Sequence, residues 1–164
     1  MNRINNIILK TISQVVVEVY QFWYNEFIIM IKVLVFGTFD GLHEGHVNFF
    51  KQAKKFGDYL VVVVGRDSTV EKTKKRLPKF DEQTRLKAVQ ECEYVNEARL
   101  GNEGVSPYVV IGEVNPDVIC LGYDQTFFAD KLAEELPKRG LGHVRIERLQ
   151  AFEPEKYHSS ILNK

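Results

Sequence analysis

From Ile31 onward, short apolar runs alternate with segments of helical periodicity, and this alternation limits the possible folds more than any other feature. The run Tyr59–Val64 is apolar at every position, as expected for a strand that is buried on both faces of a sheet. Strands and helices are predicted to alternate, beginning with a strand, at Lys32–Phe36, Gly45–Phe56, Tyr59–Val64, Glu82–Cys92, Glu97–Leu100, Tyr108–Val114, Val118–Leu121, Phe128–Arg139 and Val144–Arg148. Such an order predicts an α/β fold with a doubly wound parallel sheet of about five strands.

Ligands of open parallel sheets bind outside the carboxyl ends of the strands. The segments that follow predicted strands are therefore the candidate site, namely Gly37–His46, Gly65–Lys75 and Gly122–Gln125. The polar, lysine-rich segment Ser68–Lys79 overlaps the second of these and is predicted to be a loop.

The chain of 164 residues is long enough for one main domain with a buried core. Lys and Arg number 22, as do Asp and Glu, so the formal charge is zero and no general binding of nucleic acid is expected. Any anionic ligand must therefore be held by a local site.

Cys92 and Cys120 form no C-x-x-C pair, and two isolated thiols are typical of a reducing compartment. We therefore expect a cytoplasmic location.

Residues 1–30 are predicted to be an extension that precedes a domain at residues 31–164. Apolar residues recur in it at helical spacing, which predicts an amphipathic helix: Ile4, Ile7, Ile8, Ile12, Val15, Val16, Val19, Phe22, Trp23 and Phe27. A transmembrane span is not expected, because polar residues interrupt the apolar ones: Lys10, Gln14, Glu18 and Gln21.

We expect the helix to pack on the domain or to form a homodimer contact. Contact with a membrane surface is less favoured, because the polar face carries few charges. Met30 is an alternative natural start.

The first predicted strand runs directly into a segment that contains His43 and His46, with Gly45 between them. Two side chains three residues apart at a helix start can point the same way, and free backbone N–H groups there favour a phosphate. The imidazoles could donate hydrogen bonds to phosphate oxygens that carry charge in a transition state. The alternatives are surface or capping histidines, and a metal site, for which no third ligand stands nearby at a recognisable spacing.

The sequence Gly37-Thr38-Phe39-Asp40, followed by His43-Glu44-Gly45-His46, resembles the cytidylyltransferase-like branch of the nucleotidyltransferase superfamily. That branch includes the cytidylyltransferases that act on glycerol-3-phosphate, choline phosphate and ethanolamine phosphate, and the archaeal-type FAD synthases. The resemblance extends from Ile31 to the C-terminus and includes four later segments: Gly57–Asp67, Arg85–Val89, Pro116–Gln125 and Ser159–Ile161. It implies a Rossmann-like nucleotidyltransferase fold.

The resemblance implies an enzyme that transfers a nucleoside monophosphate from ATP or CTP to a phosphorylated acceptor, without a covalent intermediate. Pyrophosphate would leave with Mg²⁺, which is held mainly by phosphates and not by direct protein ligation. The resemblance assigns catalysis to His43 and His46, which would stabilise the pentacoordinate α-phosphate. It assigns nucleotide binding to Gly37, Thr38, Phe39, Gly45, Asp124, Ser159 and Ser160. Among these, Asp124 would meet the base or ribose, and the two serines would hold the β- and γ-phosphates.

Three further residues are weaker candidates for phosphate or acceptor binding. Lys75 belongs to a basic cluster after the second predicted strand, which could equally be a solvated loop. Arg85 could bind phosphate or could pair with an acid such as Asp81. Asp40 could hold Mg²⁺ through water or could cap a helix.

The substrates stay open at this point. The segment Leu121–Gln125 favours an archaeal-type FAD synthase, which adenylylates FMN, whereas those enzymes carry cysteines near the C-terminus and this chain has none after Cys120. Transfer of CMP to glycerol-3-phosphate, or nucleotidyl transfer to another alcohol or sugar phosphate, is the alternative. A nucleotide-binding regulator without catalysis is an alternative from another class, although both histidines are present.

Overall fold

The computed structural model describes residues 14–19, 30–104, 106–126 and 129–157. Internal contacts divide the chain into two units, Met1–Met30 and Ile31–Lys164.

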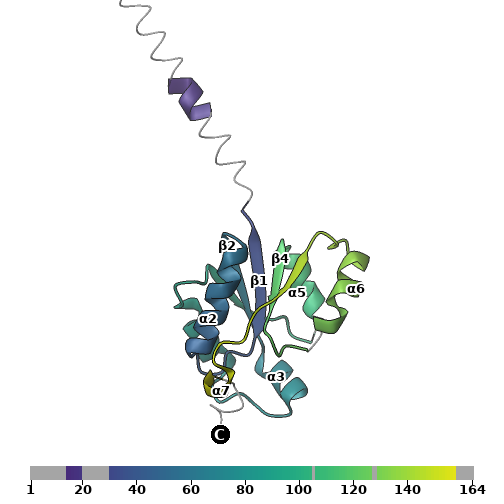
Figure 1. The fold of residues 1–164 in the computed structure, drawn as a ribbon. Helices are drawn as coiled ribbons and strands as arrows, with labels where there is room; N and C mark the ends of the chain where they lie inside the picture. The colour runs from purple at the N-terminus through teal and green to yellow at the C-terminus, as the bar shows by residue number, and fades with distance from the viewer. Residues whose placement is uncertain (1–13, 20–29, 105, 127–128, 158–164) are drawn as a thin grey trace, which may run out of the picture. The chain divides into compact units, whose positions relative to one another are not determined.

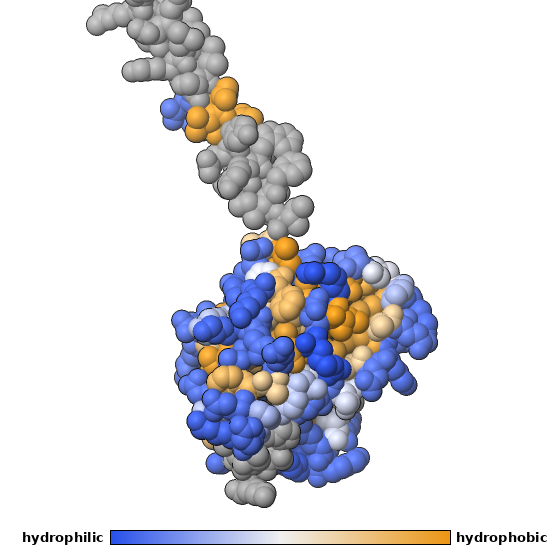
Figure 2. Space-filling model, in the orientation of Figure 1, coloured by the Kyte–Doolittle hydropathy of each residue, from blue (hydrophilic) through white to orange (hydrophobic). Residues whose placement is uncertain are grey.

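The first unit is described at residues 14–19, which are helical. Four valines of this helix are between 49% and 61% exposed, and Figure 2 shows them as a hydrophobic band: Val15, Val16, Val17 and Val19. The rest of the predicted N-terminal helix lies outside the described residues. In the described ranges, every helix is too short or too polar to span a lipid bilayer.

The second unit is built on a five-stranded sheet in the order β3-β2-β1-β4-β5, in which all neighbouring strands are parallel (Figure 1). The strands are β1 (Lys32–Gly37), β2 (Tyr59–Val64), β3 (Glu97–Leu100), β4 (Val118–Leu121) and β5 (Arg145–Arg148). The predicted parallel sheet of five strands is confirmed. The order reverses between β1 and β4, and ligands of such sheets bind at this switch point.

The helices are α2 (Glu44–Ala53), α3 (Asp67–Lys74), α4 (Glu82–Gln90), α5 (Pro107–Val114), α6 (Leu132–Lys138) and α7 (Pro154–Tyr157), with 3-10 turns η1 (Lys54–Phe56) and η2 (Ala129–Lys131). Side chains of His43, Asp81 and Ser106 accept hydrogen bonds from backbone N–H groups at the starts of α2, α4 and α5. These caps satisfy donors that have no partner inside the helix.

The prediction of a loop at Ser68–Lys79 is wrong, because α3 covers its first half. This helix buries one residue, Val70, and therefore gives no periodic apolar signal in the sequence. Its last turn carries Lys72 and Lys74, which favour a helix C-terminus through the helix dipole.

Two apolar clusters form the core, one on each face of the sheet. Leu34 and Phe36 of β1 belong to the cluster beneath α5 and α6, whereas Val33 and Val35 belong to the cluster beneath α2 and α4. This alternation along a strand is the side-chain period of two residues. Helices therefore cover both faces, and the carboxyl ends of the strands stay accessible between them.

Candidate active site

A cavity of about 670 Å³ lies at the carboxyl end of the sheet. Residues that follow four different strands line it: Thr38, Gly65, Gly101 and Gly122. The volume falls in the range of small-molecule sites, about 300–1,000 Å³. Seven residues that the sequence nominated line this cavity together: Gly37, Thr38, Phe39, His43, Gly45, His46 and Asp124.

The turn after β1 brings Phe39 back over Gly37. Phe39 has a φ of 52°, a left-handed conformation that is uncommon for a residue with a side chain, and its ring is buried. A Cβ on Gly37 would lie 2.4 Å from that ring, so only glycine leaves room for it. The edge of the Phe39 ring meets His46 at a centroid distance of 5.3 Å. The turn therefore positions one of the two histidines.

His43 caps α2 in a way that fixes which ring nitrogen carries the proton. Its Nδ1 accepts a hydrogen bond of 3.2 Å from the backbone N–H of Gly45. In the neutral ring the proton must then lie on Nε2, which becomes a donor. Nε2 is buried and has no hydrogen-bond partner in the described part of the chain. An unpaired buried donor is costly, so this atom is suited to a ligand that accepts.

His46 stacks on His43 with ring centroids 3.8 Å apart. Burial, and then the neighbouring His43 and Lys74, lower the pKa of His46 to about 3, although donation to the backbone of Gly41 opposes the shift. Burial also lowers the pKa of His43. Both rings are therefore neutral near pH 7 and serve as hydrogen-bonding groups without charge.

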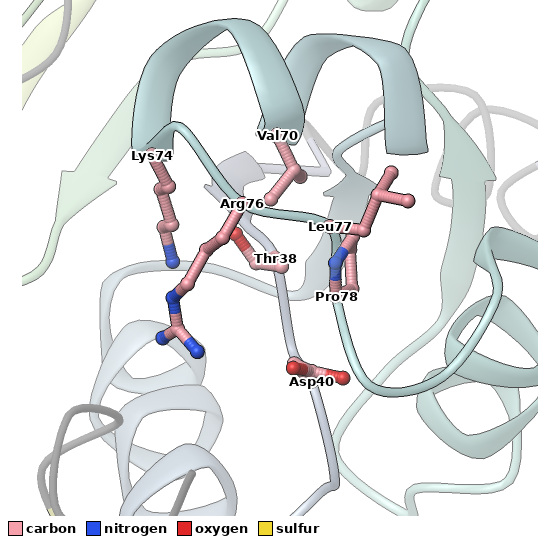
Figure 3. Close-up of a pocket in the computed structure, with 7 residues that line it drawn as sticks. All are labelled: Thr38, Asp40, Val70, Lys74, Arg76, Leu77 and Pro78. Atoms are coloured by element: carbon pink, nitrogen blue, oxygen red, sulfur yellow. The ribbon is translucent and has the colours of Figure 1, made fainter. Parts of the chain in front are cut away.

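Two basic side chains from the end of α3 converge beside the β1 turn. Figure 3 shows Lys74 and Arg76 pointing to the same side, around a small hollow that Thr38 and Asp40 also line. The hollow holds about 10 Å³, room for about one water molecule. Desolvation of its ammonium, and then the charge of Arg76, lower the pKa of Lys74. Two cations held this close favour a bound anion.

Lys74 also lines the large cavity, whereas Lys75, the lysine chosen from the sequence, does not. Lys75 has a φ of 58° and ends α3 in a left-handed conformation. A helix prediction at α3 would have indicated that Lys74 faces the cavity, because Val70 and Lys74 are four residues apart and share a face.

The weaker candidates Asp40 and Arg85 have structural partners. Both carboxylate oxygens of Asp40 accept backbone N–H groups, from Lys79 at 2.9 Å and Phe80 at 3.0 Å. Arg85 is buried and pairs with Asp67 at 2.7 Å, not with Asp81, the acid suggested from the sequence. Asp81 instead caps α4. Arg85 therefore holds the walls of the site, and its prediction as a phosphate ligand has no support in this geometry.

The loop after β4 carries Asp124 and is held by a residue that the sequence did not indicate. Arg148, at the end of β5, donates through one nitrogen to the carbonyl oxygens of Gly122 at 2.8 Å and Gln125 at 3.1 Å. The Gln125 side chain accepts the backbone N–H of Gly122 at 3.2 Å. The predicted phosphate ligands Ser159 and Ser160 lie outside the described residues.

Comparison with known proteins agrees with this geometry. A family model described as cytidylyltransferase-like matches residues 34–164. The FAD synthase of Thermoplasma volcanium is 44% identical over 135 residues, which cover 82% of this chain and 93% of the relative. The FAD synthase of Thermoplasma acidophilum is 43% identical with the same coverage.

Two solved structures are similar. The crystal structure of a lipopolysaccharide core biosynthesis protein from Thermoplasma volcanium has a TM-score of 0.70 and 44% identity, over 76% of this chain and 99% of that one. A protein of unknown function from Archaeoglobus fulgidus, 20% identical with a TM-score of 0.60 over 73% of this chain and 90% of its own, shares the fold. The present chain belongs to the cytidylyltransferase-like family and is a nucleotidyltransferase.

Proposed function

We propose that this chain is an FAD synthase, which transfers AMP from ATP to FMN and releases pyrophosphate. The observation that carries the proposal is the identity of 43–44% to the FAD synthases of two Thermoplasma species, over 93% of their length. The paired histidines and the loops that line the cavity fall inside residues 34–164, the range matched by the family model.

In the proposed reaction, an oxygen of the FMN phosphate attacks the α-phosphorus of ATP. The bond from that phosphorus to the oxygen of the leaving pyrophosphate breaks, and its electron pair leaves with pyrophosphate. Negative charge gathers on the α-phosphate oxygens, where His43 would donate through Nε2–H. Lys74 would add positive charge from α3. A bound phosphate would also raise the pKa of His46, because nearby negative charge favours the imidazolium.

Mg²⁺ is the proposed cofactor. The described residues contain no group of three or more His, Cys, Asp or Glu that could hold a metal ion. Mg²⁺ commonly keeps several waters and binds through one or two carboxylates together with substrate phosphates. The described residues therefore fit a metal that arrives with the triphosphate and is held mainly by its phosphates and by water, with Asp124 at the cavity wall as a carboxylate within reach of such water. When bound, it would neutralise charge on the phosphates.

A homodimer and a cytoplasmic location remain predictions, and membrane contact of residues 1–30 remains the less favoured alternative. Light scattering of the full chain would measure its oligomeric state. Co-sedimentation with liposomes, compared between the full chain and a chain that starts at Met30, would separate membrane contact from a subunit contact.

The test of the function crosses nucleotides with acceptors in the presence of Mg²⁺. ATP and CTP are each combined with FMN, glycerol-3-phosphate, phosphocholine and a sugar 1-phosphate, the last because the solved relative is named for lipopolysaccharide core biosynthesis. Pyrophosphate release is measured in every well, and FAD is identified by chromatography. We expect pyrophosphate release only in the well that contains ATP and FMN, with FAD as the product. Release with CTP and an alcohol phosphate, or only with the sugar phosphate, would refute FAD synthesis.

The same assay tests the role of the histidines. His43→Ala should lower turnover by about 10²–10³-fold, the usual loss when a donor to transition-state charge is removed. His143→Ala is the matched control, because His143 is exposed and does not line the cavity. Tight ATP binding by the wild-type chain, without pyrophosphate release in the presence of any acceptor, would instead favour a regulator.

A further inference from the structure

A row of near-parallel rings connects the C-terminal turn α7 to the paired histidines. Phe152 stacks on Tyr157 with centroids 5.8 Å apart and an interplanar angle of 13°. Tyr157 stacks on His43 at 5.9 Å and 14°, and His43 stacks on His46 at 3.8 Å and 27°. The edge of Phe39 closes the row against His46. We call these five residues the ring stack.

Tyr157 reaches the ring stack because α7 lies against the first turn of α2. A Cβ on Gly45 would lie 2.8 Å from the Cβ of Tyr157 and 3.0 Å from the imidazole of His43. Glycine at position 45 therefore leaves the space that Tyr157 occupies. The approach to α7 is itself constrained, since Glu153 has a φ of 40°, an uncommon conformation for a residue with a side chain.

The two nitrogen atoms of the His43 ring differ in their contacts. Nδ1 is anchored by the N–H of Gly45, whereas Nε2 is buried and without a partner in the described residues. A single hydrogen bond of 3.2 Å does not by itself fix the ring plane. Contact of a flat neighbour with the ring face removes this freedom, so the stacking partners decide where Nε2–H points.

We propose that Tyr157 is a positioning residue for the transfer reaction: its ring, stacked on His43, holds the imidazole so that Nε2–H remains directed at the reacting phosphate. The reaction step rests on the proposed function, but the contact does not depend on which acceptor is used. Tyr157 lines the cavity together with His43 and Phe152, and it is only half-buried.

Burial lowers the pKa of His43, and Tyr157 is one of the side chains that cover it. In the described residues, the ionisable groups near this stack include His46 from α2, Lys74 and Asp40, whose charges act on His46, and Lys156 from α7, whose ammonium lies 4.8 Å from the centre of the Tyr157 ring. Loss of the ring would admit water to His43 and raise its pKa toward the ordinary value of about 6.5. The pKa of His43 is therefore a readout that needs no substrate.

The test compares Tyr157→Leu with Tyr157→Phe in the full chain. Leucine keeps an apolar side chain but has no flat face, whereas phenylalanine keeps the ring and loses only the hydroxyl. We expect Tyr157→Leu to lower kcat about 10- to 100-fold, since small misplacements of catalytic groups have losses of this size, with little change in KM for FMN. Tyr157→Phe should keep the wild-type kcat. Tyr94→Leu removes a half-buried tyrosine that packs on the core without lining the cavity, and should leave kcat unchanged.

The second readout is an NMR titration of the His43 ring, whose signal is assigned by its loss in His43→Asn. Its pKa should rise in Tyr157→Leu and keep the wild-type value in Tyr157→Phe and Tyr94→Leu. Tyr157→Met is a second variant, because it keeps a flexible apolar side chain without a flat face, and it should raise the pKa of His43 in the same direction. It carries the test if Tyr157→Leu fails to fold.

Wild-type kcat and an unchanged His43 pKa in Tyr157→Leu would overturn the proposal. Equal loss of kcat in Tyr157→Leu and Tyr157→Phe would also overturn it, since the hydroxyl and not the ring would then be responsible. Failure of the wild-type chain to make FAD would refute the proposed function, whereas the NMR comparison would still decide whether Tyr157 holds His43.

Discussion

Nη2 of Arg85 lies 2.7 Å from a carboxylate oxygen of Asp67, and the Arg85 side chain has no exposed surface. The same guanidinium donates to the carbonyl oxygens of Thr38, Gly65 and Phe80. One side chain of α4 therefore ties together the segments that leave β1 and β2. Arg85 shapes the cavity from behind its wall, because it is not among the cavity-lining residues.

Replacement of Arg85 by Met should destabilise the fold. Removal of the guanidinium leaves three carbonyl oxygens without their donor and the partly exposed Asp67 carboxylate without its cation, and a buried acceptor left without a partner costs about 1–3 kcal/mol. Urea denaturation would measure the change in the free energy of unfolding. Arg145→Met is the control, because Arg145 is exposed on β5, and it should change stability by less than about 0.5 kcal/mol. A stable Arg85→Met chain that no longer binds ATP would restore the phosphate-ligand hypothesis.

Lys74 and Lys75 are adjacent in sequence, but only Lys74 lines the cavity. Lys74→Met should lower kcat/KM by about 10²–10³-fold, because it removes a positive charge from the wall of the cavity where the phosphates are proposed to bind. Lys75→Met should remain within about twofold of the wild type, as expected for an exposed surface position. Steady-state kinetics with ATP as the varied substrate would measure kcat/KM for both variants. Equal losses of kcat/KM in the two variants would mean that Lys74 and Lys75 act through their summed charge and not through one lysine.

The pKa of Lys74 predicts a further feature of the same kinetics. Because its pKa is lowered, the ammonium loses its proton at a lower pH than an ordinary lysine would. Activity should therefore decline on the alkaline side earlier than for an unperturbed lysine, and Lys74→Met should lack that decline.

The sheet and the histidine turn could be predicted from the sequence because each carries a strong local signal. The run Tyr59–Val64 is apolar throughout, and the strand that it forms is buried on both faces. The pair His43 and His46 follows a predicted strand directly, and the structure brings both rings to the cavity. The resemblance of the same residues to the cytidylyltransferase-like family is confirmed by the family model.

The parts that could not be predicted depend on contacts between residues far apart in the chain. Arg148 holds the loop at Gly122 from 26 positions away, and nothing near either residue indicates the contact. Tyr157 meets His43 only because α7 returns to the start of α2. The burial of Arg85 against Asp67 could not be predicted either, because a charged residue in a helix gives no sign that it is buried.

Stability should fall on acidification, because the folded chain resists protonation of His46. An unfolded histidine takes up its proton near pH 6.5, whereas the pKa of His46 in the fold is about 3. Between these values the unfolded state binds more protons, so the free energy of unfolding falls as the pH falls, by up to about 1.4 kcal/mol per pH unit. Above about pH 6.5 both states are neutral at this site, and this histidine contributes no slope.

Urea denaturation at several pH values between about 4 and 8 would measure this slope, and His46→Asn should reduce it. The substitution should change the slope of stability against pH only in the acidic range, so the unchanged slope above about pH 6.5 is an internal control. An equal slope in the wild-type chain and His46→Asn would mean that His46 titrates normally in the folded chain.

Arg148 should affect substrate binding more than stability. Its side chain is exposed at the end of β5, and it fixes the loop that carries Asp124 by donating to the carbonyl oxygens of Gly122 and Gln125. Loss of charged hydrogen bonds of this kind should raise KM for ATP about 5- to 10-fold in Arg148→Ala, which corresponds to about 1–1.4 kcal/mol. We expect kcat to change little, because the contact holds a loop away from the paired histidines. Arg145→Ala is the matched control, since Arg145 lies at the opposite end of the same strand and should leave KM unchanged. A fall in kcat at constant KM would instead connect this loop to the chemical step.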